Sequence, residues 1–446
     1  MSQDSWRTVQ EVSCGVTESS KIRYVEGICA THSIAPVWFV MPSFCLVRQP
    51  VFGANGVLLG YEIRFRNAED GQHAFSQSFL TGSFDVARAN LPAFLVATRE
   101  QLLDDAFQMG DPANAILLLP PDLLVDDDVV RAVARHRDRG GAIVLDGLSE
   151  TVSPSEALLP QATWVRMDVR LLGADELSRV CARVVGTGAT RARTPRLLAG
   201  YVSDQTQYAA ATALKFDAFQ GMFFSRAEPL PAADLPSTTV SAMRLMGLAR
   251  NENVKDRELE DVISTDPVLT FQLLRLVNSA ATGLRGVSSI GQALRLIGRS
   301  AFMRWMAVAV AASRRSTNGV DQELVRHAVE RGRLLEQLAG GPRDAGTLFL
   351  VGLFSLLDSV FRMPLPEIVS RVALSDDATA ALLEGTGPYA DALAFADSYE
   401  LGMFEHAQEL ATAMHVDPAK LNEFYTTALS WTAETLSPSL EGAARA

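Results

Sequence analysis

Three carboxylates in the first half of the chain stand where they could hold a metal ion. Glu62 lies within the apolar segment GYEIRFR, where a buried strand would normally carry no charge. Asp146 and Asp168 end the short apolar runs AIVLD and TWVRMD. Hard divalent cations such as Mg²⁺ need several oxygen ligands, most of them carboxylates. The alternative is structural, because a buried glutamate can pair with Arg64 or Arg66 and an aspartate after a strand can cap the following turn.

Histidine and cysteine are too sparse for zinc chemistry or a disulfide framework. The cysteines are Cys14, Cys29, Cys45 and Cys181, and no two have C-x-x-C spacing. The six histidines are scattered and include no H-x-x-x-H pair. We therefore predict no zinc site and a protein that keeps its thiols reduced.

The composition is that of a folded, acidic protein. Its 446 residues are 48% hydrophobic and carry a net charge of −12, which allows two or three domains and argues against general nucleic-acid binding. The most apolar stretch, LFLVGLFSLL at 348–357, is too short to cross a bilayer. The prediction is a cytoplasmic protein without a membrane span.

Short apolar runs alternate with helical patterns in the first half. The predicted strands are AILLL at 115–119, AIVLD at 142–146, TWVRMD at 163–168 and RLLAG at 196–200. Between them, DDDVVRAVARHRDRG and GADELSRVCARVVG have helical spacing, acidic starts and glycine ends. This alternation predicts a parallel sheet with crossover helices, either layered or closed into a barrel.

A proline-rich segment, SRAEPLPAADLPS at 225–237, separates the two halves. Helical patterns follow it at 265–280, at 288–298, where Ser289 and Gln292 form a capping box, and at 417–436. We predict three parts, which are a poorly ordered tail at 1–44, an α/β barrel at 45–232 and an all-helical domain at 233–446.

The first half resembles an EAL domain, a TIM-barrel-like fold that hydrolyses cyclic di-GMP with two metal ions. Gln49, Pro50, Gly60, Glu62 and Arg66 fall on positions of its opening motif, and Gln220-Gly221 match its closing pair. The resemblance covers roughly residues 45–230. It implies that Gln49 and Arg66 lie beside the nucleotide.

The site that this resemblance implies is incomplete. Glu62, Asp146, Asp168 and Gln220 remain, whereas Val96, Leu118, Gly147, Gly200 and Ser203 stand where the family carries asparagine, aspartate or glutamate. Apolar residues cannot supply the oxygens that two metals require. We predict a degenerate site with no catalytic residue, no metal and no cofactor. The segment is also short for eight strands, so we expect a barrel element to be missing or reduced.

The second half resembles an HDOD domain, a helical relative of the HD phosphohydrolases. The resemblance rests on the segment 259–306, which includes Asp266-Pro267 and the run LVNS, and it continues at 350–369. The HD enzymes bind metal through a His-Asp dipeptide, which this chain lacks, and Ser355-Leu356 stand at the matching place. Trp305 is either a core residue or, with Arg304, part of a surface for a partner.

The resulting prediction is a protein that is not an enzyme. It is a signalling scaffold that binds protein partners through the helical domain, in cyclic di-GMP-related control of motility, biofilm formation or virulence. The alternative is a receptor that binds cyclic di-GMP through Gln49 and Arg66 without cleaving it. A second alternative is a weak cyclic di-GMP phosphodiesterase.

Overall fold

A computed structural model of the chain covers both halves. It describes residues 44–66, 71–104, 107, 111–151, 157–186, 194–226, 239–241, 243, 245–246, 254–264, 270–271, 273–274, 277–278, 286–312, 318–372 and 374–441. All but the last residue of the predicted tail at 1–44 and most of the predicted boundary at 225–237 lie outside these residues, and so does part of the helix expected at 265–280. The barrel and the helices belong to one compact unit.

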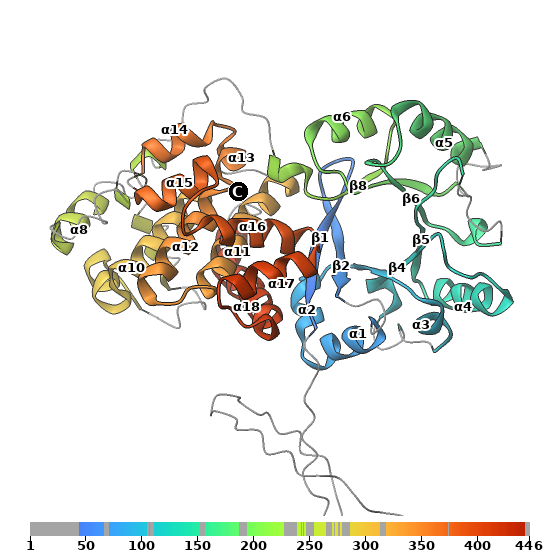
Figure 1. The fold of residues 1–446 in the computed structure, drawn as a ribbon, viewed down its shortest axis with the longest axis horizontal. Coiled ribbons are helices and arrows are strands. Elements are labelled where there is room, and N and C mark those ends of the chain that lie inside the picture. Colours follow the sequence, from blue (N-terminus) through green and yellow to red (C-terminus); the bar gives the residue numbers. More distant parts are fainter. Residues whose placement is uncertain are drawn as a thin grey trace, which may run out of the picture. The chain divides into compact units, whose positions relative to one another are not determined.

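The first half is a closed barrel of eight strands in sequential order (Figure 1). The strands are β1 (Leu46–Gly53), β2 (Leu58–Phe65), β3 (Ala93–Val96), β4 (Ala115–Leu119), β5 (Ala142–Leu145), β6 (Trp164–Asp168), β7 (Arg196–Gly200) and β8 (Ala218–Gln220). The predicted α/β barrel is confirmed. All eight strands of the barrel are present. The expected reduction is seen in the length of two of them, because β3 has four residues and β8 has three.

The first strand runs against the others. β1 pairs antiparallel with β2 and β8, whereas every pair from β2 to β8 is parallel. Strands β2 to β8 therefore all end at the same mouth of the barrel. The helices around the barrel are α1 (Gly71–Leu80), α2 (Ser83–Arg88), α3 (Arg99–Leu103), α4 (Asp127–Asp138), α5 (Ala174–Gly186) and α6 (Gln205–Ala213) (Figure 1).

Side chains alternate between the barrel interior and the surrounding helices, as strand geometry requires. One apolar cluster fills the interior with Val51, Phe94, Leu118, Val144, Trp164, Leu198 and Ala218. Two residues further toward the mouth, the same faces of β5, β6 and β8 carry Asp146, Arg166 and Gln220. The mouth is thus polar where the base of the barrel is apolar, and this places the candidate site.

The second half is helical. Its helices are α8 (Asp256–Ser264), α10 (Ile290–Ala312), α11 (Gly319–Gln337), α12 (Pro342–Phe354), α13 (Leu357–Phe361), α14 (Leu365–Ser370), α15 (Asp376–Glu384), α16 (Ala390–Glu400), α17 (Phe404–Ala413) and α18 (Leu421–Glu441). Half of the predicted capping box forms, since Ser289 Oγ accepts from the Gln292 N–H at 3.1 Å. The side chain of Gln292 reaches back to the N–H of Ser288, at 3.0 Å, instead of that of Ser289. Among the described residues, no helix is long and apolar enough to cross a membrane.

Polar side chains from β1 and β2 contact the helices through buried bonds. Arg48 donates from Nη2 to Glu330 Oε1 of α11 at 2.5 Å and from Nη1 to the Ala87 carbonyl at 3.1 Å. The Tyr61 hydroxyl donates to Glu323, also on α11, at 2.9 Å. Because buried charges are stable only when they are paired, these contacts hold the barrel and α11 in one register.

Candidate functional site

A buried cluster of three charged side chains occupies the barrel interior near the mouth. Arg166 of β6 donates from Nη1 to Glu62 Oε2 of β2 at 2.7 Å. It also donates from Nε and Nη2 to the two carboxylate oxygens of Asp146, at 2.7 and 2.5 Å. Glu62 and Arg166 are each 1% exposed. Glu62 is therefore a close partner of Arg166, and its other carboxylate oxygen forms the predicted ion pair with Arg64 at the longer distance of 3.9 Å.

The guanidinium of Arg166 is held firmly in its charged form. Burial works against the charge, but the carboxylates of Glu62 and Asp146 outweigh burial and raise the pKa of Arg166. Tyr201 covers the group, with its ring centroid 4.9 Å from the guanidinium carbon. Burial raises the pKa of Tyr201, so its phenol keeps the proton at neutral pH.

A glycine makes room for this arginine. At Gly200 of β7, a Cβ atom would lie 2.8 Å from Cδ of Arg166, which is too close for any side chain. The sequence resemblance places a glutamate at this position. A side chain at position 200 would therefore force Arg166 to move.

The residues at the mouth do not fit a two-metal centre in this arrangement. Both remaining acidic residues of the cluster already bond Arg166, and Leu118 is fully buried in the apolar interior. Val96 is 47% exposed and offers no oxygen from its side chain. Among the described residues, no three histidine, cysteine or acidic side chains lie close enough together to hold a metal ion. Any metal that used Glu62 and Asp146 would first have to displace Arg166.

Gln220 and Gln49 form a hydrogen-bonded bridge across the mouth. Gln220 Oε1 accepts from the Tyr201 N–H at 2.8 Å, and its Nε2 donates to Gln49 Oε1 at 2.6 Å. Gln49 Nε2 then donates to the Glu400 carbonyl at the end of α16, at 2.9 Å. Gly221 follows with φ +133° and is pressed against the backbone of Val202. Gln220 and Gly221 therefore stabilise the packing of the chain segments at the mouth of the barrel.

A cavity of about 330 Å³ opens at this mouth, within the usual size range of small-molecule sites. We call it the mouth pocket. From the barrel, its lining includes Gln49, Arg64, Arg170, Tyr201 and Met222. Ligand sites in barrels of this architecture lie at the carboxyl ends of the strands, which is where Arg170 and Tyr201 stand.

Arginines gather around one aromatic ring in the mouth pocket. The guanidinium carbons of Arg170 and Arg64 lie 4.1 and 5.6 Å from the centroid of Tyr201. Each guanidinium has five N–H donors, of which hydrogen bonds to described residues use one in Arg64 and two in Arg170. Asp168 is the partner of Arg170 at 2.7 Å. Unused donors beside an aromatic ring suit an anion that carries a planar ring.

Of the two residues predicted to lie beside the nucleotide, only Gln49 lines the mouth pocket. Gln49 lines the mouth pocket, but both ends of its amide are already bonded. Arg66 is not among the residues that line the pocket, whereas Arg64 is. The sequence analysis missed Arg64, Arg170 and Tyr201 as pocket residues. Strand parity could not have separated Arg64 from Arg66, because both have the parity of Glu62.

A second ion cluster adjoins the mouth pocket on the helical side. Glu400 is fully buried, and its Oε1 accepts from Arg331 Nε at 2.9 Å while its Oε2 lies 3.1 Å from His327 Nε2. Burial alone would raise the pKa of Glu400. Arg331 and His327 outweigh burial and lower the pKa from 4.5 to about 2. Glu400 therefore stays ionised well into the acidic range.

Acid should weaken the fold through this carboxylate. The pKa of Glu400 is lower in the folded state than in the unfolded state, so its contribution is present above about pH 4.5 and is lost as the pH falls toward about 2. The shift corresponds to roughly 3 kcal/mol. Urea unfolding between these pH values should show a shallower loss of stability in Glu400→Gln than in the wild type. An equally steep loss in Glu400→Gln would contradict the assignment, and the exposed Glu405→Gln serves as control.

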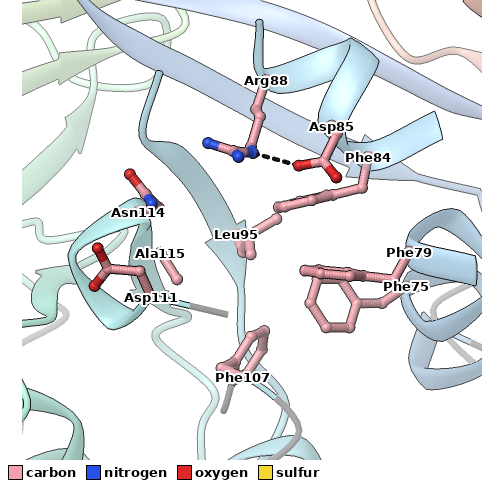
Figure 2. Close-up of a pocket in the computed structure, with 10 residues that line it drawn as sticks. All are labelled: Phe75, Phe79, Phe84, Asp85, Arg88, Leu95, Phe107, Asp111, Asn114 and Ala115. Atoms are coloured by element: carbon pink, nitrogen blue, oxygen red, sulfur yellow. Dashed lines mark hydrogen bonds and ion pairs between the residues drawn. The ribbon is translucent and has the colours of Figure 1, made fainter. Parts of the chain in front are cut away.

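An aromatic cavity lies on another part of the barrel, away from these charges (Figure 2). It measures about 190 Å³, and Phe75, Phe79, Phe84 and Phe107 line it. Two charged residues at this cavity, Asp85 and Arg88, form an ion pair with each other at 2.8 Å. None of the predicted site residues contributes to this cavity.

The helical residues singled out from the sequence have structural roles. Ser355 donates to the Gly352 carbonyl at 2.7 Å, and Leu356 is buried. Trp305 is 5% exposed and packs on Trp431, with ring centroids 5.3 Å apart. Of the two roles considered for Trp305, the structure therefore supports the core.

Comparison with known proteins gives a family match in the helical half and relatives that align with most of the chain. The family model of the HDOD domain matches residues 235–373. The cyclic di-GMP phosphodiesterase CdgJ of Vibrio cholerae serotype O1 is 27% identical over 389 residues, covering 82% of this chain and 88% of CdgJ. The uncharacterized protein YuxH of Bacillus subtilis is 23% identical over 402 residues, covering 86% of this chain and 97% of YuxH. The Bacillus subtilis YkuI protein, with an EAL domain, in complex with cyclic di-GMP and calcium, is 14% identical with a TM-score of 0.34, covering 41% of this chain and 55% of YkuI.

These comparisons confirm some predictions and correct one. The predicted organisation, an EAL-like barrel followed by an HDOD domain, is confirmed. A function in cyclic di-GMP signalling is supported. The prediction that the chain is not an enzyme is contradicted, because a relative aligned over most of both chains is named a phosphodiesterase. That prediction was based on the number of missing metal ligands. Such a number argues against one arrangement of metal ions, but it does not test whether the reaction takes place. Protein partners of the helical half stay a prediction.

Proposed function

We propose that the protein binds cyclic di-GMP in the mouth pocket and acts in cyclic di-GMP signalling through this binding. The observation that carries the proposal is that Arg64 and Arg170 both lie against the ring of Tyr201 and line a cavity of about 330 Å³. The relative named a cyclic di-GMP phosphodiesterase supports the choice of ligand.

The chemistry of the ligand matches the pocket. Cyclic di-GMP carries two phosphodiester anions and two guanine rings. A guanidinium binds a phosphate through paired N–H donors, and an aromatic ring or a guanidinium plane can stack on a base. Arg170 is half exposed, so an entering phosphate can reach it without rearrangement of the core.

Replacing Arg170 by methionine should weaken binding of cyclic di-GMP roughly tenfold, since one charge-assisted hydrogen bond contributes about 1.5–3 kcal/mol. Calorimetry with the full-length protein is the measurement. Arg179→Met is the matched control, because Arg179 is also an exposed arginine paired with a carboxylate but lies on α5 outside the pocket. A wild type that does not bind cyclic di-GMP, or an Arg170 variant that binds as well as the control, would refute the proposal.

Hydrolysis of cyclic di-GMP is the second candidate function, and the similarity to the named phosphodiesterase favours it. Glu62 and Asp146 are acidic residues at the mouth that such a reaction could use, but Arg166 holds both. The same samples, incubated with Mg²⁺ or Mn²⁺ and analysed for the linear dinucleotide, measure the reaction directly. Turnover that is lost in Glu62→Gln would assign hydrolysis to this site, and no turnover above a blank would reject it.

A further inference from the structure

The wall of the mouth pocket opposite the barrel strands comes from the helical half. Arg331 of α11 and Asp397 and Glu400 of α16 line it, together with Leu401 and Met403, which follow α16. Four of these five residues lie beyond the segment 235–373 that matches the HDOD domain. The wall is therefore built mainly by the C-terminal helices of this chain.

Barrel side chains hold this wall in place. The last carbonyls of a helix have no partner within the helix. At the end of α16, the Glu400 carbonyl accepts from Gln49 Nε2 at 2.9 Å, and the Leu401 carbonyl accepts from Arg64 Nη1 at 3.2 Å. Gly402 turns the chain with φ +75° close to Arg64. The wall and the barrel mouth thus form one continuous surface.

The exposed groups on the wall differ in kind from those on the barrel side. The Asp397 side chain is 61% exposed and bonds Arg331 at 2.9 Å, which leaves most of its acceptor sites open. Leu401 and Met403 are 43% and 50% exposed and present apolar surface. The barrel side offers arginines for phosphate, whereas the wall offers a carboxylate and a patch for the face of a base.

A carboxylate distinguishes guanine from adenine. The pairing edge of guanine presents two adjacent donors, N1–H and N2–H, whereas adenine presents an acceptor at N1 beside a single amino group. A carboxylate only accepts hydrogen bonds, so it can pair with both guanine donors and would repel the adenine N1 lone pair. A site built to bond one edge discriminates strongly against the other.

We propose that Asp397 is the residue that selects guanine in the mouth pocket, with Leu401 and Met403 against the face of the same base. The inference rests on the proposed binding of cyclic di-GMP and adds that the helical half takes part in it. Binding at the barrel mouth then changes contacts of α16 directly, and this gives the ligand a physical connection to the helical half.

Full-length protein should be titrated with cyclic di-GMP and with cyclic di-AMP. The wild type is expected to prefer cyclic di-GMP, and Asp397→Asn should reduce affinity for cyclic di-GMP about tenfold, because a bidentate base contact is worth about 1–3 kcal/mol of discrimination. The preference over cyclic di-AMP should shrink by a similar factor. Asp391→Asn, an exposed aspartate at the start of α16 that does not line the pocket, is the matched control.

The outcomes separate this inference from the proposed function. If the wild type binds neither dinucleotide, the proposed function fails. If it binds cyclic di-GMP and Asp397→Asn keeps both affinity and preference, only the role of Asp397 is overturned. Unfolding midpoints of the two aspartate variants should match the wild type. A lower midpoint for Asp397→Asn alone, with an unchanged preference, would show a structural role instead.

Discussion

Replacing Arg166 by methionine is expected to destabilise the protein by about 3–5 kcal/mol at neutral pH, because removal of one partner leaves buried carboxylates without a counter-charge. Arg166 supplies three hydrogen bonds to Glu62 and Asp146. Glu62 is 1% exposed and cannot turn to water. Methionine fills a similar volume, so the loss reports on charge rather than on a cavity. Equilibrium unfolding in urea is the measurement.

A second substitution tests the cause of that loss. Glu62→Gln in the Arg166→Met background removes the unpaired charge and should recover part of the lost stability. Arg131→Met is the control, since Arg131 forms an exposed pair with Asp128 of the kind that contributes little to stability. If Arg166→Met is as stable as this control, the cluster does not hold the barrel together.

Replacing Arg48 by methionine should also cost about 3–5 kcal/mol, for the same reason at a different place. Arg48 is buried between β1 and α11, where it bonds Glu330 and the Ala87 carbonyl and covers the Tyr61 ring at 4.2 Å. The bond to Glu330 joins the barrel to the helical half. The variant should therefore weaken both halves, and probes in each should report the same lowered midpoint.

Two probes make this test decisive. Trp164 lies in the barrel and Trp305 in the helical half, so single-tryptophan versions can follow each half by fluorescence. Arg371→Met, at an exposed pair with Glu367, is the control. Two separate transitions, with only one moved by Arg48→Met, would show that the halves fold independently and that the buried pair does not couple them.

Local structure could be predicted from the sequence where local forces decide it. The strands at 115–119 and 196–200 were predicted at their observed bounds, because an apolar run between turn residues specifies a strand. The cap by Ser289 was predicted for the same reason, since the N–H that it accepts is three residues away. The alternation of strands and helices indicated the α/β fold, and the order of the two halves followed from their different periodicities.

That the metal site is incomplete stays a prediction from the sequence, which rests on residue type because an apolar side chain supplies no oxygen. The absence of an oxygen ligand at Val96 and Leu118 needed no coordinates. The conclusion drawn from it, that the chain is not an enzyme, went further than residue types allow and is contradicted by the named relative.

Only the tertiary structure decided the partners of the charged residues. Glu62 makes its short hydrogen bond with Arg166, which is 104 residues away, whereas the predicted pair with Arg64 forms only as a longer ion pair of 3.9 Å. Barrel closure brings β2 and β6 to face each other across the interior, and the missing side chain at Gly200 leaves the space that Arg166 fills. Neither fact is encoded in a local pattern.

The composition of the mouth pocket likewise depended on the tertiary structure. Asp397 and Met403 lie more than 300 residues from Gln49 in the chain, and they share a pocket because α16 ends on the barrel mouth. Sequence periodicity shows which face of a helix is apolar, but it carries no information on which distant surface receives that face. Amino-acid types and local spacing therefore determined the elements and the missing ligands, whereas long-range packing decided which charges are neutralised and which remain open to a ligand.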